Sequence, residues 1–589
     1  MEGAPVDLND LPDSAPQEAA PPTPPAPPAP PAQKKSLADR MIKGSAAVFA
    51  ARIFLFMFGI VQAKALWHYF GQSALTDGFL FALEAVVMQF FLAAEKLIVP
   101  AFVPVFMEQV NKGSEEKAWE TATGMLKLFA LAIALVLVGL MVFPGALVNL
   151  FAWMTRKEFD PGRMAHVTFF VRWSSPTIMG LVLGSVTYAV MTSYKRFFLA
   201  AFGEAASKLC IIAGVLAAAL AAGSASPAAT KIMAAFLLAA GFARVGTHLW
   251  ALRDKLGKLK PLAPLRSPAM RKYLILAAPL AIGVVVARGR DMFNGYGVMI
   301  VLEEGVLSAN SYGRKIFTAV NGLVPFSVAI AMFPFFCEMV DRDDKAELGR
   351  FLTKACRMLL LVFAPMAAGV AVLSLPFFRA VFQSGRADIE FIRLAALANV
   401  CYVAVLPAQA IEAVIMQAFF SDRRMIAPTV IGIVMSSASV AWSWYAVAVL
   451  KLTWSDAIMA VALGYTASRY VKVVLLVVFL KKTIPAFGLR ETLGFLARLL
   501  AVVTFTAGIA WELKWIYEGL VEVHCGTLTG MRLAARIGPQ LAVASAAGLV
   551  FFLLGCRVLR LSELGEMLRW AREKLRRRGK ASAGAGGVD

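Results

Sequence analysis

The chain has 589 residues, of which 59% are hydrophobic and 16% are charged, and its mean hydropathy is +0.69. A soluble globular protein has about 25% charged residues, so this composition excludes the ordinary soluble classes. The formal net charge of +21 would also fit nucleic-acid binding, but the basic residues cluster at the ends of long apolar runs, as in a membrane protein. We therefore expect an all-α integral membrane protein with no nucleic-acid partner.

Apolar runs of the length needed to cross a bilayer recur along most of the chain and predict about fourteen transmembrane helices of about 20 residues or more. They lie near residues 46–66, 77–105, 124–150, 166–192, 199–222, 229–252, 272–302, 306–337, 352–378, 391–419, 427–450, 455–480, 492–512 and 536–556. Several of these runs are longer than one span, which is expected of tilted or kinked helices.

Two pairs of similar motifs occur in the same order and predict two pseudo-repeated lobes. PVFMEQVNKG at Pro104 is matched by PFFCEMVDRD at Pro334, and AVMTSYKRFF (189–198) is loosely matched by AVIMQAFFSDRR (413–424). Internal repeats of this kind are common in transporters. We divide the chain into a disordered Pro/Ala-rich cytoplasmic tail (1–43), a first lobe with spans 1–6 (44–260), a second lobe with spans 7–12 (261–485), two additional spans (486–557) and a basic amphipathic cytoplasmic tail (558–589).

Lys and Arg are unevenly distributed between alternate connections. They are frequent before the first span and after the sixth, whereas the opposite connections near 68–75, 222–230 and 303–306 have almost none. Because cytoplasmic loops carry the excess of basic residues, both termini are expected in the cytoplasm. The 153–165 connection, which contains Arg156, Lys157 and Arg163, is an exception to this asymmetry.

The second predicted span, within Phe70–Pro104, carries three carboxylates, Asp77, Glu84 and Glu95. At about 100° per residue they share one stripe of the helix. A charge at the centre of a membrane helix costs roughly 2.5 to 3.5 kcal/mol, so the stripe is expected to face a water-filled cavity or partner cations. The alternative is that these residues form structural ion pairs inside a bundle.

Further charges lie inside other spans. The seventh span contains Arg288, Arg290, Asp291 and Asn294, and the eighth contains Arg314 and Lys315. Arg presents a planar fork to phosphate oxygens and Lys a point charge, so these residues suit an anionic headgroup. The alternative is that Arg288 simply pairs with Asp291, three residues further along the helix. The first span adds Arg52 and Lys64, for which facing the cavity and reaching towards an interface are both open.

The chain lacks the marks of an enzyme or an ATPase. Its six Cys and four His residues are scattered, and no Gly-rich phosphate loop is present. We expect a transporter with no metal, no cofactor and no ATPase of its own. A coupling ion or the membrane potential is the candidate driving force.

Several motifs resemble one membrane-protein family, the MurJ (MviN) lipid II flippases of the MOP exporter superfamily. FGQSALTDGF followed by AEKLIVPAFVPVF resembles the family's FGAG…TDAFFVAF…AEGAFSQAFVP. SYGRKIFTAVNGLV…MFP resembles its YADRLYQLPLGV…LP, FQSGR its LFERG, and AFFSDRRMIAP its FYARQDTKTP. Together these motifs cover most of residues 45–450.

The resemblance implies fourteen helices in two lobes around a central cavity, with alternating access. It implies translocation of the undecaprenyl-pyrophosphate-linked peptidoglycan precursor from the inner to the outer leaflet of the bacterial cytoplasmic (inner) membrane. Asp77 and Glu95 occupy positions of the family's functional acids. We add Glu84 and Asp291 to these as conformational or coupling acids. We expect a monomer that works among membrane lipids and with enzymes of cell-wall synthesis as candidate partners.

Three departures from the family pattern redistribute its cations. The first-span GFxRD motif is here GIVQA, with Gln62 in place of Arg, the Arg pair of the second span is Phe90 and Phe91, and the Asp-Arg of the eighth span is Arg314-Lys315. Compensation for the missing cations is then expected from the seventh span. The predicted substrate-binding residues are therefore Arg290, Arg314, Lys315, Arg288, Asn294, Arg52 and Lys64.

Other functions are open at this point. Another MOP-type exporter would carry lipid-linked polysaccharide repeat units or, in a net acidic cavity, small cations and drugs. A membrane glycosyltransferase or ligase would need catalytic carboxylates or His in an external loop, where Asp160 and Glu518 are isolated. A scaffold without transport activity would follow if the lost family Arg residues had abolished activity.

The predicted topology can be tested with reporter fusions. A reporter fused at Ser224 should be external and one fused at Lys258 cytoplasmic, because the Lys/Arg asymmetry places these connections on opposite sides. Compartment-specific alkaline phosphatase and fluorescent-protein activities would report the two locations. The same location for both fusions would show that the predicted topology is wrong.

Overall fold

The computed structural model describes residues 54–112, 114–194, 196–223, 226–259, 267–323, 332, 336, 338–340, 342–422, 424, 426–525, 528–566 and 569. All the regular elements among these residues are helices, which confirms the predicted all-α membrane class. The predicted tail at 1–43 and most of the one at 558–589 lie outside the described residues.

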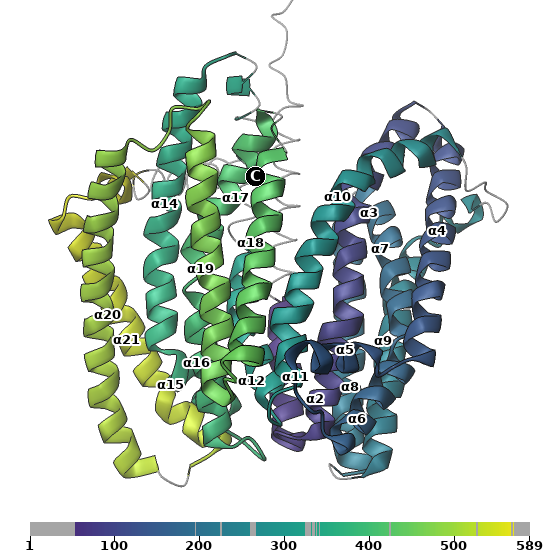
Figure 1. Cartoon of the computed structure of the whole chain (residues 1–589), viewed down its shortest axis with the longest axis horizontal. Coiled ribbons are helices and arrows are strands. Elements are labelled where there is room, and N and C mark those ends of the chain that lie inside the picture. Colours follow the sequence, from purple (N-terminus) through teal and green to yellow (C-terminus); the bar gives the residue numbers. More distant parts are fainter. Residues whose placement is uncertain are drawn as a thin grey trace, which may run out of the picture. The chain divides into compact units, whose positions relative to one another are not determined.

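A first bundle follows helical residues 54–70. Its elements are α2 (Ala74–Leu80), η1 (Phe81–Val87), α3 (Met88–Asn111), α4 (Glu115–Val142), α5 (Ala146–Thr155), α6 (Pro161–Ser174), α7 (Thr177–Ser193), α8 (Phe197–Ala221), α9 (Pro227–Ala251) and the short η2 (Leu256–Lys258). In this bundle α7 packs against α3, α4 and α9, and α8 packs against α9 (Figure 1).

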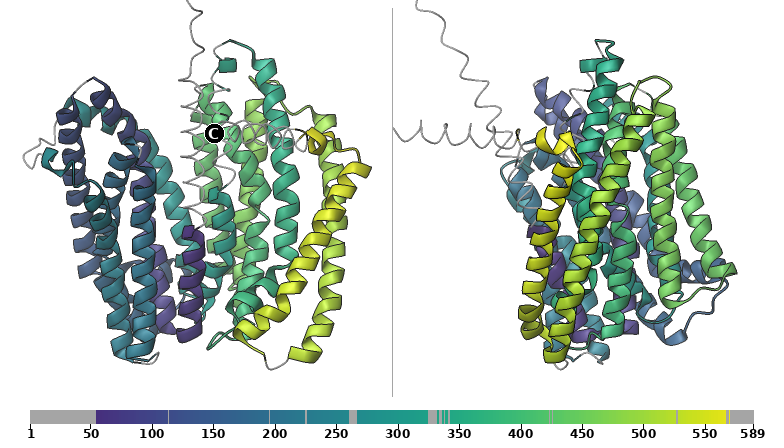
Figure 2. Two further views of the ribbon diagram at one scale, coloured as in Figure 1. Left: turned by 180° about the vertical axis from the view of Figure 1, so that it is seen from behind. Right: turned by 90° about the vertical axis from the view of Figure 1, so that its left-hand side faces the viewer.

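The remaining helices form the second bundle, except that α10 runs alongside α3 of the first bundle (Figure 1). They are α10 (Pro268–Met292), η3 (Phe293–Gly297), α11 (Val298–Ile300), α12 (Val306–Leu323), α14 (Lys345–Val372), α15 (Ser374–Phe382), α16 (Ile389–Val403), α17 (Leu406–Ser421), α18 (Ile426–Trp444), η4 (Tyr445–Val449), α19 (Trp454–Leu480), α20 (Leu489–Cys525) and α21 (Gly530–Val558). Here α12 packs on α16, α18 on α19 and α14 on α17, and α10 contacts both α18 and α3 of the first bundle. The two last helices, α20 and α21, run together beside α14 and α15 (Figure 2).

Ten of the described helices are long and apolar enough to cross a membrane, or eleven if α6 and α7, bent by 42°, form one span. Two of the other predicted spans, 46–66 and 306–337, extend beyond the described residues. The predicted span 272–302 corresponds to α10, η3 and α11, which are not among these ten. The total of fourteen and the central cavity therefore stay predictions.

Two predicted spans are wrong in their limits. The run 124–150 is divided, because α4 ends at Val142 and α5 begins at Ala146. Pro144 lies in the turn between them, where its ring prevents the helix from continuing. Similarly, the predicted span 352–378 ends early, since α14 stops at Val372 and α15 follows from Ser374.

The helix that carries the three predicted carboxylates is not uniform. It runs as α-helix through Ala74–Leu80, as π-helix through Phe81–Val87 and again as α-helix from Met88. A π-helical turn holds an extra residue and shifts the following side chains by about 100°. The uniform stripe predicted for Asp77, Glu84 and Glu95 is therefore wrong beyond η1.

Helices α7 and α9 of the first bundle approach each other through glycines. A Cβ atom on Gly241 would lie 2.6 Å from the carbonyl oxygen of Thr177, and one on Gly180 would collide with the backbone of Gly241. The Thr177 hydroxyl also donates to the Leu237 carbonyl at 2.9 Å. Small residues allow this close backbone contact between membrane helices, where van der Waals packing drives association.

This contact predicts a difference between two glycines of α9. Gly241→Val should lower the thermal unfolding midpoint, because forcing atoms into a filled contact costs about 1–3 kcal/mol. Gly246→Val is the matched control, since a Cβ there meets nothing within 4 Å. The midpoint can be followed by size-exclusion chromatography of the heated, detergent-purified protein. Equal destabilisation by both substitutions would contradict the assigned contact.

Candidate functional site: a buried charge network between the bundles

Asp77 is a buried carboxylate in the interior, with only 1% of its surface exposed. Its Oδ1 accepts hydrogen bonds from the Ser308 hydroxyl at 2.6 Å and the Ser308 amide at 3.3 Å. Its Oδ2 accepts from the Gly305 amide at 2.7 Å and lies 3.2 Å from the Arg163 guanidinium. Asp77 of α2 therefore joins α6 and the start of α12.

The position of Asp77 follows from the start of α12. This helix begins at Val306, after Gly305, which has a positive φ of 86° and no side chain to cap the helix. The first amides of a helix lack intrahelical partners and carry partial positive charge. Asp77 therefore acts as an N-terminal cap for α12 supplied from the other bundle.

Arg163 was not predicted as a site residue. Its guanidinium bonds Asp77 and also donates to the carbonyl oxygens of Leu302 at 2.6 Å and Ile300 at 3.0 Å. Asp160 caps α6 by accepting from the Arg163 amide at 2.7 Å. Arg163 could have been noticed because it lies in the 153–165 connection, which is the exception to the Lys/Arg asymmetry. A basic residue on the side where basic residues are rare is a candidate for an internal ion pair.

Other contacts join the bundles near Asp77. The Arg386 amide donates to the His68 carbonyl at 3.0 Å, and the His68 ring lies 3.1 Å from the Ser384 hydroxyl. Gly385, with φ of 63°, leaves no room for a side chain against His68. The Gln72 amide group donates to the Glu304 carbonyl at 2.7 Å. The connections near 68–75 and 303–306, predicted to be external, therefore meet in a closed arrangement.

Glu84 forms a second bridge to α12. Its carboxylate lies 3.4 Å from the Lys315 ammonium and accepts from the Tyr296 hydroxyl at 3.3 Å. The two bridges, to Ser308 and to Lys315, both join residues separated by 231 positions. Asp77 and Glu84 thus face the same helix at two depths. Glu95 is half-buried on α3, beyond the π-helical segment.

The charges of α10 form a compact group. Asp291 lies 2.6 Å from Arg290 and 3.4 Å from Arg288. The Arg290 guanidinium also donates to the Ser436 hydroxyl at 3.1 Å, and the Asn294 amide group donates to the Ser439 hydroxyl at 2.9 Å. The predicted Arg288–Asp291 pair is therefore present, but Arg290 shares the carboxylate.

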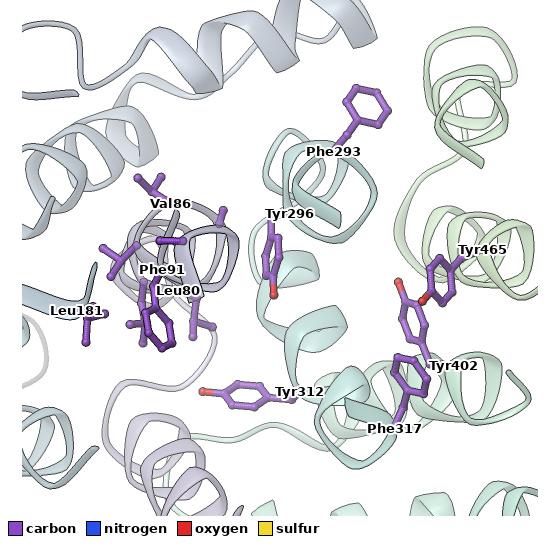
Figure 3. Packing of buried hydrophobic residues seen from close by; sticks show 14 of the residues in the cluster. Leu80, Val86, Phe91, Leu181, Phe293, Tyr296, Tyr312, Phe317, Tyr402 and Tyr465 are labelled. Atoms are coloured by element: carbon purple, nitrogen blue, oxygen red, sulfur yellow. The ribbon is translucent and has the colours of Figure 1, made fainter. Parts of the chain in front are cut away.

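Arg314 is half-buried, and its buried guanidinium atoms lack their full set of partners. Its Nε and Nη1 atoms have no hydrogen-bond partner, and its guanidinium packs over the rings of Tyr296 at 5.4 Å and Tyr402 at 5.3 Å. Gly295 leaves the necessary room, since a Cβ there would collide with Arg314. Figure 3 shows Tyr296, Tyr402 and neighbouring Tyr465 in this aromatic region. Unsatisfied buried donors make Arg314 a candidate anion ligand.

Of the two first-span cations, Lys64 is half-buried and Arg52 lies outside the described residues. Another cation lies beside the place where the family's second-span Arg pair is lost. The guanidinium of Arg244, on α9, packs over Phe91 at 4.5 Å and Tyr188 at 6.0 Å. A cation from another helix therefore lies beside Phe91. This contact was not predicted from the sequence.

A charge cluster between α17 and α19 was also not predicted from the sequence. Glu412 lies 2.6 Å from the Lys472 ammonium and 3.5 Å from the Arg469 guanidinium. All three side chains are largely buried, and Arg469 packs over Tyr465 at 5.1 Å. The available signal was charge inside the predicted spans 391–419 and 455–480. In the described part of the chain, no group of three metal-ligating side chains is found.

The sequence and the fold of this chain are similar to those of known proteins. The family model described as "Lipid II flippase MurJ" matches residues 66–528. A relative from Rhizobium meliloti, named as a probable lipid II flippase MurJ, is 24% identical over 358 residues, which are 59% of this chain and 64% of the relative. The chain thus spans slightly less than two thirds of that relative.

Solved structures share the fold, and two of them have the following similarity to this chain. "Lipid II flippase MurJ, inward closed conformation" has a TM-score of 0.66 and 18% identity, covering 88% of this chain and 99% of that one. An inward-facing multidrug resistance MATE family transporter of the MOP superfamily has a TM-score of 0.60 and 11% identity, covering 74% and 98%.

The helical bundles and their buried charges therefore define an all-α membrane-protein fold that is shared with these solved transporter structures. Within that class, the chain belongs to the lipid II flippase MurJ family, whose model matches most of its length.

The network around Asp77 predicts a strong effect of Arg163. Arg163→Ala should destabilise the protein by about 3–5 kcal/mol, because removing one partner leaves a buried charge uncompensated. Arg172→Ala on the same helix is the control, since Arg172 is exposed and makes only a 3.1 Å bond to the Met141 carbonyl. Thermal unfolding of the purified variants measures the difference.

The same network predicts that Asp77→Asn reduces the loss caused by Arg163→Ala. The neutral amide no longer leaves a buried charge without its partner, so the double variant should be more stable than the sum of the single changes implies. A double-mutant cycle on the unfolding data measures this coupling. Additive losses would contradict a direct Arg163–Asp77 interaction.

Proposed function

We propose that this protein translocates the undecaprenyl-pyrophosphate-linked peptidoglycan precursor, lipid II, from the inner to the outer leaflet by alternating access. Membership of the MurJ family supports the substrate class. The observation that carries the proposal is the buried cationic interior, above all the unsatisfied guanidinium donors of Arg314. In this scheme the protein is a monomer of the bacterial inner membrane with both termini in the cytoplasm.

The substrate explains why cations are needed inside the membrane. A pyrophosphate cannot enter a low-dielectric interior bare, since burying an uncompensated charge costs several kcal/mol. Arg290, Arg314 and Lys315 would replace its hydration, and hydrogen bonds to charged groups contribute about 1.5 to 3 kcal/mol each. Arg288 and Asn294 flank these cations, and Lys64 and Arg52 would extend the site towards the first helix.

The carboxylates would govern the conformational cycle. Asp77 holds the start of α12 and so favours the closed arrangement of the connections beside it. Glu84 and the substrate would compete for Lys315, so that the arriving pyrophosphate loosens the Glu84–Lys315 bridge. Once the lipid leaves, Glu84 would pair with Lys315 again, and Asp291 would pair with Arg288 and Arg290 again. Glu95 would be a further conformational acid on the continuation of the Asp77 and Glu84 helix. A coupling ion or the membrane potential would drive the return step.

The substrate assignment is tested by replacement in cells. Cells depleted of their own lipid II flippase should survive when they express this chain. A capsule-flippase mutant should not recover capsule export under the same conditions. If the chain is well expressed in the membrane but rescues only the capsule mutant, it exports polysaccharide repeat units instead.

The cation site predicts graded effects at one position. Arg314→Glu should abolish flipping while the protein stays folded, because it places a negative charge where the pyrophosphate would bind. Arg314→Lys should retain part of the activity, since it keeps the charge but loses the planar fork. The measurement is appearance of labelled lipid II in the outer leaflet of proteoliposomes, with binding to the purified protein measured in parallel. Normal flipping by Arg314→Glu would place the site elsewhere.

The proposed role of Asp77 predicts a different kinetic signature. Asp77→Asn should slow turnover more than it weakens lipid binding, because Asp77 contacts α12 and not the proposed headgroup site. Turnover in proteoliposomes and binding of lipid II to purified protein separate the two effects. Equal losses of binding and turnover would instead assign Asp77 to the substrate.

A further inference from the structure

A small recess lies between α10, α18 and α19. It is lined by Arg290, Met435, Ser436, Ser468 and Arg469, whose side chains fill it in this arrangement, so an entering anion would have to displace one of them. The two arginines come from helices distant in sequence and are 7% and 9% exposed. The recess thus brings two buried guanidinium groups and two serine hydroxyls together.

Arg469 has spare hydrogen-bonding capacity at this recess. Its Nε has no partner, and its contacts with both oxygens of Glu412 are long, at 3.5 Å. Lys472 binds the same carboxylate at 2.6 Å and would continue to neutralise it if Arg469 moved away. Arg469 can therefore exchange a weak partner for a stronger one without leaving Glu412 unpaired.

The charge balance around the recess favours an anion. Arg290 and Arg288 share Asp291, and Arg469 and Lys472 share Glu412. Four cations thus accompany two carboxylates in this group of side chains. A bound cation would face this excess of positive charge, whereas an anion would compensate it.

We propose that Arg469 and Arg290 form a binding subsite for a phosphate-type anion, with Ser436 as an additional donor and Lys472 holding Glu412 aside. The anion displaces Glu412 from Arg469 and accepts from its free Nε. This inference rests on the proposed function in one respect, namely that the transported lipid supplies the pyrophosphate. Free inorganic pyrophosphate offers the same chemistry and serves as the probe.

The first experiment measures binding of inorganic pyrophosphate to the purified full-length protein in nanodiscs by isothermal titration calorimetry. Arg469→Gln should weaken binding about 10- to 100-fold, the loss expected for a charge-assisted hydrogen bond. Arg469→Lys should recover part of it.

The matched control is Arg357→Gln. Arg357 is also an arginine between two carboxylates, Glu491 at 3.5 Å and Glu563 at 3.3 Å, and it packs over Phe495 at 5.4 Å. It does not line the recess, so its substitution should leave pyrophosphate binding unchanged. Equal binding by wild type and Arg469→Gln would overturn the proposal, as would equal losses in Arg469→Gln and Arg357→Gln.

A second variant gives a change in the opposite direction. Glu412→Gln removes the carboxylate that competes with the anion, so pyrophosphate should bind more tightly even if the protein unfolds at a lower temperature. Unchanged or weaker binding by folded Glu412→Gln protein, checked by size-exclusion chromatography, would overturn the proposed exchange. A purely structural role of the cluster predicts no gain in affinity.

Transport assays then separate this inference from the proposed function. If wild-type protein flips lipid II and Arg469→Gln slows flipping and weakens binding of both the lipid and pyrophosphate, the lipid headgroup uses the subsite. If lipid II is not flipped but pyrophosphate binding depends on Arg469, the subsite stands and serves a free anion or another lipid. If lipid II is flipped and Arg469→Gln changes neither binding nor transport, the subsite is wrong and the proposed function stands.

Discussion

The structure depends on compensating charges that lie in a low-dielectric interior. Asp77 shows how demanding this is, because one carboxylate receives two amides, a hydroxyl and a guanidinium. These donors come from α6 and from the start of α12, so satisfying the charge fixes the two bundles to each other at this end. A buried ion pair adds little net stability by itself, but losing one partner is costly. The compensation therefore works as a geometric constraint, and a change in its partners can change the conformation.

The cations deeper in the interior are compensated less fully, and this contrast separates their roles. The Glu84–Lys315 pair is partly accessible and spaced at 3.4 Å, which leaves Lys315 able to change partners. Arg314 depends largely on tyrosine faces, which attract a guanidinium without accepting its hydrogen bonds. Arg469 has a similar surplus of donors. The Asp77 carboxylate near the closed connections is thus fully paired, although the Nε of its partner Arg163 is not. The free donors of Arg314 and Arg469 suit the anion of the proposed function.

Much of this arrangement could be predicted from the chain itself, for physical reasons that also explain the failures. Hydropathy located most spans because bilayer thickness sets the helix length, and Asp77 and Glu84 stood out as charges in an apolar helix. The π-helical turn at Phe81–Val87 has no comparable signature, so the phase of Glu95 could not be extrapolated. Arg163 and the Glu412 cluster were missed because their partners lie far away in sequence, and burial alone reveals that they are paired.

This chain lacks arginines that the family pattern has in its first two spans. The effect of this loss depends on the total electrostatic field of the interior and not on those positions alone. Phe91 replaces one of those arginines, yet Arg244 from α9 lies over its ring. On the other side, Arg288, Arg290, Arg469 and Lys472 gather around two carboxylates. A pyrophosphate responds to the sum of nearby charges and to the direction of their donors, both of which can be supplied from different helices. Under the proposed function, cations supplied from these other helices would serve the same anion class as the arginines they replace.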